Sequence, residues 1–173
     1  MRIRHLNRFV RSDNPPDIIF MGVGENGHIA FNDPHIAFFD DPLGVKIVDL
    51  DLKCRNQQVN DACFETIDDV PTHAITLTIP TLMKAARIFV IVPTALKADA
   101  IGKIYNGEIT QACPASILRT HKAATLYTDV AGAHYRLNND EQNLYLYRGV
   151  VAIRCHSRLW KTSCSYRRRA ECS

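Results

Sequence analysis

Short apolar runs bounded by polar or turn residues recur along the chain and predict five β-strands. Their β-branched and aromatic content suits buried strands better than helices. The clearest run has five consecutive apolar residues between Arg87 and Pro93, which is the pattern of a strand buried on both faces. The predicted strands are Asp17–Met21, Val45–Leu50, Ala74–Ile79, Ile88–Val92 and Ala124–Tyr127.

Segments with helical features separate these strands. Pro80 suits the first turn of a helix, where its missing N–H costs nothing. Thr94 is a candidate N-cap for the next helix, and Gly107 lies just past the expected end of that helix. Strands and helices thus alternate along the chain. This alternation predicts right-handed crossovers and an α/β fold, a Rossmann-like parallel sheet with flanking helices. The predicted helices lie at Asn56–Asp69 (with a loop), Thr81–Ala86, Thr94 to about Tyr105, and Pro114–Arg119.

The excess positive charge belongs to the end of the chain. The 173 residues contain 21 Lys and Arg against 18 Asp and Glu. Residues 151–173 hold six of the basic groups and one acid, which leaves 15 basic and 17 acidic groups in residues 1–150. Charge therefore gives no reason to expect a nucleic-acid partner. We predict a domain over residues 1–137 and a basic, Cys-rich tail over 138–173, disordered or read out of frame. A nucleic-acid-binding tail and a metal-binding Cys cluster are the alternatives for that tail.

The cysteines and the opening segment bear on the compartment. The six cysteines include no C-x-x-C pair, and no apolar signal segment precedes them, which favours reduced thiols in a cytoplasmic protein. Residues 1–12 are Arg-rich and free of acids, as in a solvated helix face that leads into the first strand or, alternatively, a transit peptide. No apolar run approaches the roughly 18 residues of a membrane span, so no membrane is expected.

The run Gly22-Val23-Gly24-Glu25-Asn26-Gly27 fits the dinucleotide fingerprint G-x-G-x-x-G literally and follows a predicted strand. That fingerprint needs a helix that opens at its third glycine and aims its N-terminus at a pyrophosphate. Here Asn32-Asp33-Pro34 follows after one turn and breaks any helix. We therefore predict no nicotinamide or flavin cofactor. The three glycines are expected instead to offer exposed amides to an anionic or hydroxylated ligand.

His28 and Asp33, with Asn26 beside them, are the candidate chemistry of this loop. A carboxylate that bonds an imidazole fixes its tautomer and keeps its pKa near working pH, so the pair suits general acid/base catalysis. The alternative is that these side chains only satisfy backbone groups in a tight turn. Spacing alone does not decide between the two.

Longer stretches of the sequence resemble one family. GVGENGHIAFNDP (Gly22–Pro34) is similar to the GxGxxGHIAFNEP signature of glucosamine-6-phosphate deaminases. The likeness continues through Val70–Ile101 and CPASILRTHKAATLYTD (Cys113–Asp129), and covers about Asp17 to Gly132. This is the carboxyl-terminal half of a usual member, so the amino-terminal part of the family fold, with its proton-shuttling aspartate, is expected to be missing.

The resemblance implies roles for particular residues. His28 would be the acid/base of ring opening, Asp33 would replace the family's glutamate, and Asn26 would stand where an aspartate often assists. Lys97 would hold the sugar phosphate, the glycines Gly22, Gly24 and Gly27 would line the substrate site, and Arg55 is the nearest candidate for the family's phosphate-binding arginine. No metal ligand is assigned. The stretch HIAFFDDPLGV replaces the Ser- and Arg-rich segment of allosteric members, so activation by an acetylated sugar phosphate is not expected.

The implied reaction converts glucosamine 6-phosphate to fructose 6-phosphate with release of ammonia, without a cofactor. The runner-up is 6-phosphogluconolactonase, whose loop resembles GHTASLFP instead of GHIAFNDP. A sugar-phosphate-binding pseudoenzyme, which keeps His28 and Lys97 but does not turn over, is the alternative from a different class. The expected partners are a small-molecule sugar phosphate and, in a homo-oligomer, further copies of the chain.

Overall fold

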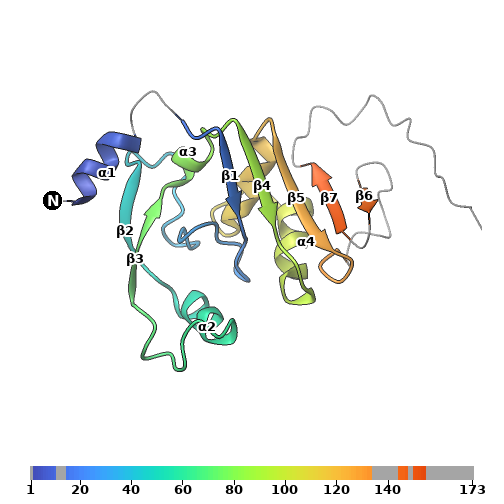
Figure 1. The fold of residues 1–173 in the computed structure, drawn as a ribbon, viewed down its shortest axis with the longest axis horizontal. Coiled ribbons are helices and arrows are strands. Elements are labelled where there is room, and N and C mark those ends of the chain that lie inside the picture. Colours follow the sequence, from blue (N-terminus) through green and yellow to red (C-terminus); the bar gives the residue numbers. More distant parts are fainter. Residues whose placement is uncertain (1, 11–14, 134–143, 148–149, 155–173) are drawn as a thin grey trace, which may run out of the picture.

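The structure, a computed structural model, describes residues 2–10, 15–133, 144–147 and 150–154. A five-stranded mixed sheet lies at its centre (Figure 1). Its first three strands are parallel and its last two are antiparallel. The α/β class is confirmed, with helices beside a sheet that is parallel only in part. In spatial order the strands are β1 (Ile18–Met21), β4 (Arg87–Ile91), β5 (Ala124–Asp129), β7 (Val150–Arg154) and β6 (Leu144–Tyr147).

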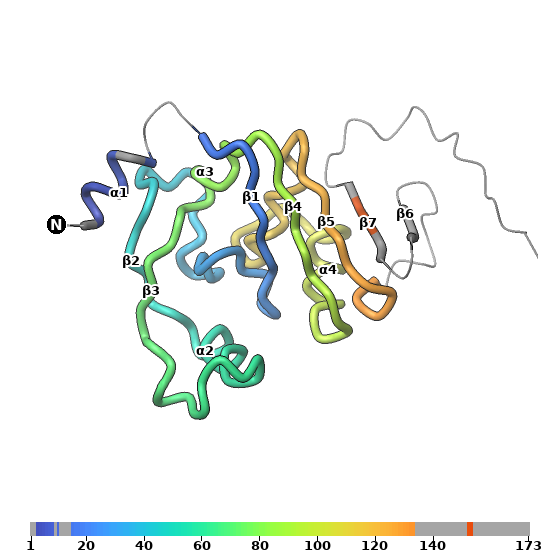
Figure 2. The backbone as a smooth tube through the Cα atoms, viewed as in Figure 1, coloured from blue at the N-terminus to red at the C-terminus, as the bar shows by residue number. Residues whose placement is uncertain are grey.

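Two of the predicted strands form a sheet of their own instead of joining the parallel one. β2 (Val45–Asp49) and β3 (His73–Leu77) pair antiparallel. In their register Val45 lies opposite Leu77, and Asp49 lies opposite His73. The chain reverses between them through α2 (Leu52–Asn60) and the loop 61–72, so that the two strands run in opposite directions. In Figure 2 this pair stands apart from the larger sheet.

The opening segment is part of the fold. Helix α1 (Arg2–Val10) lies against β2, as Figure 1 shows. The Asn7 amide nitrogen donates to Val45 O at 2.7 Å, and its oxygen accepts from the Gly44 and Val45 amides, each at 2.8 Å. The predicted helix is confirmed, and it is anchored by a side chain instead of being wholly solvated.

The helix after β4 begins later than predicted. Thr94 is the N-cap residue of the 3₁₀ turn that precedes this helix, but the Thr94 side chain makes no capping bond, and its φ of +84° is rare for a β-branched residue. Its backbone N–H donates to Asp129 Oδ2 at 3.0 Å, which ties it to the end of β5. A 3₁₀ turn, η1 (Ala95–Lys97), follows, and α4 (Ala98–Asn106) starts only then. The other short helices are α3 (Ile79–Leu82) and η2 (Pro114–Thr120), near the positions predicted for them.

The core fills one face of the five-stranded sheet. Ile88, Val90 and Leu126 are buried on that face, where α4 and η2 pack. The opposite face carries a row of rings from three strands: Phe20 stacks on Phe89 at 5.2 Å between centroids, and Phe89 on Tyr127 at 6.2 Å. Phe20 is 70% exposed, so in the described residues this face is open where parallel sheets are usually covered.

The sheet continues beyond the predicted domain boundary at residue 137. β7 pairs with β5, and β6 pairs with β7, so residues 144–147 and 150–154 belong to the sheet and not to a disordered tail. The sequence patterns predicted five strands in residues 17–127 and did not predict β6 or β7. Residues 155–173, with Cys155, Cys164 and Cys172, lie outside the described part of the chain. Within that part, no helix is long and apolar enough to cross a membrane.

Candidate active site

The candidate site begins where β1 ends. The glycine loop (residues 22–34) leaves the carboxyl end of β1 and lies between the two sheets (Figure 2). No helix opens at Gly27, as predicted from Asn32-Asp33-Pro34. Gly27 has a φ of +84°, and a Cβ there would lie 2.8 Å from Cys113 Sγ. This glycine is therefore required by both its backbone conformation and its neighbour.

The glycines make room for a side chain more than they offer amides. A Cβ on Gly24 would clash with three atoms of the His28 imidazole, so this glycine lets the ring pack directly against the backbone. The Gly24 N–H donates to His28 O at 3.0 Å and the Gly27 N–H donates to Gly24 O at 2.9 Å. The expectation of exposed amides is wrong for these two glycines, because the loop itself uses them. Gly22 is exposed.

His28, Asn26 and Asp33 come together as the sequence predicts. The imidazole Nδ1 of His28 lies 2.6 Å from Asn26 Oδ1 and 3.3 Å from Asp33 Oδ1. The amide nitrogen of Asn26 donates to Asp33 Oδ1 at 2.9 Å. The His28 side chain is 11% exposed and Asp33 is fully buried, so of these two the imidazole is the one that reaches toward solvent. The arrangement has the geometry of an imidazole oriented by a buried carboxylate.

Asp51 is a fourth member that the sequence did not point out. Its Oδ2 accepts from the Asn26 amide nitrogen at 3.0 Å, and its backbone N–H donates to Asp33 Oδ2 at 3.2 Å. Its other oxygen, Oδ1, accepts from the Cys54 backbone N–H at 2.6 Å and caps α2. An acid just before a predicted helix is an ordinary cap signal, and nothing in the spacing of 18 residues links it to Asp33.

The hydrogen bonds determine the charge of Asp33. Burial raises the pKa of this carboxyl, but hydrogen bonds from His28, from Asn26 and from the Asp51 backbone outweigh it and hold the pKa below its ordinary value. Asp33 is therefore a carboxylate at neutral pH. A buried carboxylate with several donors around it is a fixed negative charge next to the imidazole.

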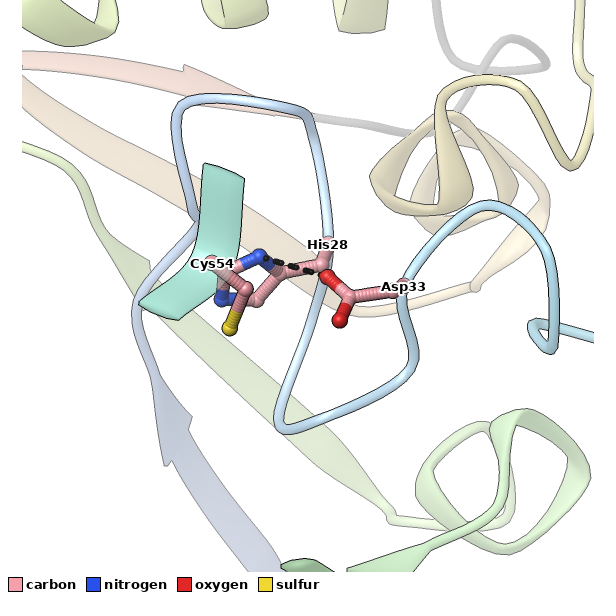
Figure 3. A group of neighbouring side chains, drawn as sticks. All are labelled: His28, Asp33 and Cys54. Atoms are coloured by element: carbon pink, nitrogen blue, oxygen red, sulfur yellow. Dashed lines mark ion pairs between the residues drawn. The ribbon is translucent and has the colours of Figure 1, made fainter. Parts of the chain in front are cut away.

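Cys54 is the nearest thiol to this group. One ligand atom from each of His28, Asp33 and Cys54 lies within 4.8 Å of the others, and Figure 3 shows the three side chains facing one another. Burial and the negative charges of Asp33 and Asp51 raise the pKa of the Cys54 thiol to about 12, which opposes the thiolate that a metal would require. The carboxylate and Nδ1 are already hydrogen-bonded. The three residues fit a hydrogen-bonded network better than a metal centre.

Lys97 carries a positive charge to the glycine loop. Its Nζ lies 4.0 Å from Glu25 Oε1, and its side chain is only 13% exposed. The Nζ atom is buried and has no hydrogen-bond partner among the described residues. A buried ammonium group that lacks partners is costly, so its position favours an anionic ligand.

Arg55 is directed elsewhere. Its Nη2 donates to Ile67 O at 2.6 Å and to Val70 O at 3.0 Å, and so fastens the loop 61–72 onto α2. These contacts engage only one of its nitrogens, whereas Nε is buried and has no hydrogen-bond partner among the described residues, so the role of Arg55 in phosphate binding stays a prediction. Lys53, two residues earlier on α2, lies nearer the glycine loop: its Nζ donates to Glu25 O at 3.4 Å. The resemblance to a family with a phosphate-binding arginine favoured Arg55, and no sequence pattern pointed to Lys53.

The protein is an α/β protein with a mixed β-sheet. The histidine–carboxylate group beyond the carboxyl end of one strand makes its site suited to proton transfer. The chain belongs to the family of glucosamine-6-phosphate isomerases/6-phosphogluconolactonase, which matches residues 2–127.

Relatives within this family are similar over the same region. The chain is 40% identical over 125 residues to the glucosamine-6-phosphate deaminase of Bacillus cytotoxicus, covering 71% of this chain and 46% of that protein. It is 39% identical over 116 residues to the deaminase of Bacillus cereus, covering 67% of this chain and 42% of that protein. The chain therefore spans about half the length of the curated relatives it matches.

The fold of the chain is similar to the folds of solved structures. A monomeric glucosamine-6-phosphate deaminase is similar with a TM-score of 0.70 and 34% identity, over 78% of this chain and 54% of that one. The 6-phosphogluconolactonase of Trypanosoma brucei is similar with a TM-score of 0.56 and 16% identity, over 78% of this chain and 52% of that one. The second likeness concerns the fold alone.

Proposed function

We propose that the site binds glucosamine 6-phosphate and takes part in its conversion, with water, to fructose 6-phosphate and ammonia. The observation that carries the proposal is the pairing of two features at one loop: the oriented His28 imidazole and the buried Lys97 ammonium, which has no hydrogen-bond partner among the described residues. The identity of 39–40% to curated deaminases supports this substrate class. The free thiols of Cys54, Cys63 and Cys113 are consistent with a cytoplasmic reaction.

Ring opening is the step we assign to His28. The imidazole takes the proton from the O1 hydroxyl while the C1–O5 bond breaks and C1 becomes a carbonyl carbon. The same proton then passes to O5. The partly exposed imidazole, with a buried carboxylate behind it, is suited to carry a proton between two oxygens of one substrate.

Lys97 is the residue we assign to the phosphate. An ammonium ion binds a phosphate as a compact charge with three donors, and the Lys97 Nζ has its donors unused in the described residues. Lys53 is a second cation near the same loop, at the Glu25 carbonyl. We propose it, in place of Arg55, as the additional phosphate contact.

Isomerisation requires a second base. A proton must move from C2 to C1 through an enolamine, after which water replaces the amine and ammonia leaves. By the family resemblance this base belongs to the portion of the deaminases that the chain does not match. We therefore assign ring opening and phosphate binding, and not the whole reaction, to the described residues.

The lactonase alternative rests on weaker support. The lactonase structures are 16–21% identical, against 34% for the deaminase structure. Phe31-Asn32-Asp33-Pro34 also departs from the lactonase loop. The buried Asn32 amide donates to Ile29 O at 3.0 Å and to Leu77 O at 2.8 Å, and so fixes the turn that presents Asp33. A leucine in its place would lose both side-chain hydrogen bonds, although Ile29 O would keep the backbone N–H of residue 32 and Leu77 O would keep the Thr76 hydroxyl.

Ligand binding and turnover test the proposal separately. We expect glucosamine 6-phosphate, and not glucosamine, to raise the melting temperature of the chain. Lys97→Met should abolish most of that shift, whereas Lys84→Met, a change at an exposed lysine, should not. Release of ammonia from bound sugar identifies a deaminase, and binding without release identifies the pseudoenzyme. Hydrolysis of 6-phosphogluconolactone without ammonia release, or no shift with any sugar phosphate, would contradict the proposal.

A further inference from the structure

The orientation of the Asn26 amide is fixed by three separate contacts. Its nitrogen faces two carboxylate oxygens, Asp33 Oδ1 at 2.9 Å and Asp51 Oδ2 at 3.0 Å. Its oxygen accepts from the His28 backbone N–H at 3.0 Å. A flipped amide would place its oxygen against both carboxylates and its NH₂ against an N–H group. All three contacts would become repulsive or unpaired, so only the observed orientation satisfies them.

This orientation determines which ring nitrogen of His28 carries the proton. Asn26 Oδ1 only accepts hydrogen bonds, and it lies 2.6 Å from Nδ1. Asp33 Oδ1, 3.3 Å from the same nitrogen, is also an acceptor. Nδ1 must therefore be the donor, which leaves Nε2 of the neutral imidazole with a lone pair.

We infer that Asp51 is a positioning residue, which acts through Asn26 to hold His28 in the tautomer protonated at Nδ1 and leaves Nε2 to accept a proton. The importance of Nε2 for turnover rests on the proposed ring opening. The tautomer itself follows from the contacts and does not depend on that proposal.

The two oxygens of Asp51 have different partners, which separates this role from helix capping. Oδ1 caps α2 through the Cys54 N–H, and Oδ2 holds the Asn26 amide. The backbone N–H of Asp51 also binds Asp33 Oδ2. One residue thereby links the start of α2 to both side chains that face the imidazole. Asp33 is ionised, which agrees with its acting only as an acceptor toward Asn26 and His28.

The tautomer is measured directly by the ¹⁵N chemical shifts of the His28 imidazole in the full chain. The spectrum is recorded on the alkaline plateau of a pH series, where the ¹⁵N shifts of the ring no longer change with pH. We expect a protonated Nδ1 and an unprotonated Nε2. A protonated Nε2 with an unprotonated Nδ1 would overturn the inference. This measurement uses the unmodified chain and needs no variant.

Asp51→Ser tests the part played by Asp51, because serine retains the helix cap but has no second oxygen for Asn26. We expect the ratio of the two tautomers to shift toward Nε2–H by roughly tenfold, as loss of one hydrogen bond to a charged group would cause. Asp69→Ser is the matched control: Asp69 bonds Thr66 in the loop 61–72 and should leave the ratio unchanged. An unchanged ratio in folded Asp51→Ser would reduce Asp51 to a cap. A chain that holds the tautomer but binds no sugar phosphate would contradict the proposed function and leave this inference standing.

Discussion

Lys97 Nζ lies 4.0 Å from Glu25 Oε1, too far for a hydrogen bond, and both side chains are largely covered. The carboxylate partly balances the ammonium charge and also competes with any anion that binds there. We expect Glu25→Gln to lower the dissociation constant for inorganic phosphate by a factor of about 2–10, because a nearby like charge is removed from the ligand's surroundings.

Titration calorimetry with inorganic phosphate measures this change. Glu108→Gln, at an exposed acid, serves as the control and should leave phosphate binding unchanged. Weaker phosphate binding in Glu25→Gln would show that Glu25 supports the anion site instead of competing with it.

Gly24 is expected to tolerate no side chain. Gly24→Ala places a Cβ into the His28 ring, so the imidazole must move, and we expect a loss of about 1–3 kcal/mol in the free energy of unfolding. The histidine ¹⁵N signals should shift at the same time. Gly102→Ala in α4 is the matched control: nothing lies within 4 Å of its Cβ, and alanine should stabilise the helix by about 0.5–1 kcal/mol. Equal effects of both substitutions in a urea titration would contradict the close packing of the ring on Gly24.

The lowered pKa of Asp33 predicts how stability depends on pH. A carboxyl whose pKa is lower in the folded state stabilises the fold fully above its ordinary value, which is 3.8 here, and this contribution is lost as pH falls through the folded value. Asp33→Asn should therefore flatten the acid limb of the stability curve below about pH 4 and be less stable than the parent chain at pH 7. An acid limb identical to that of the parent would show that Asp33 gains no stabilising hydrogen bonds on folding.

One face of the five-stranded sheet is open in the described residues, which predicts binding of apolar molecules. Phe20 is 70% exposed and stacks on Phe89, so the rings form a continuous apolar surface. We expect the native chain to enhance the fluorescence of anilinonaphthalene sulfonate, and Phe20→Ser to reduce that enhancement with a change in unfolding free energy within about 0.5 kcal/mol. Leu96→Ser, at a residue 71% exposed but outside this face, is the control. Equal reduction by both variants would contradict a specific surface.

Local patterns predicted the elements well and their pairing less well. The bounded apolar runs at β1, β4 and β5 predicted the three parallel strands correctly, although one face of these strands is open in the described residues. β2 and β3 carry equally good strand patterns, yet they pair with each other. Which strands become neighbours depends on contacts between distant residues, and a pattern confined to one segment holds no information about them.

In the candidate site, too, the sequence predicted the local contacts and missed those between distant residues. His28, Asn26 and Asp33 lie within eight residues and were found together, because a tight turn brings near neighbours into contact. Asp51 reaches this group only through the position of α2. Arg55 and Lys53 stand on that helix two residues apart, and only the structure separates the one that fastens a loop from the one that faces the glycine loop.

Catalysed exchange between the α and β anomers of glucosamine 6-phosphate tests most directly whether His28 opens the sugar ring. The anomers interconvert through the open chain, so the exchange rate reports ring opening without requiring isomerisation or ammonia release. Magnetisation-transfer NMR with the full chain should show exchange well above the rate without protein. His28→Gln should lower the catalysed rate by about 10²–10⁴, the range for loss of a general acid/base, with sugar-phosphate binding retained. An exchange rate equal to that of the free sugar, in a chain that binds it, would contradict the assignment of His28 to ring opening.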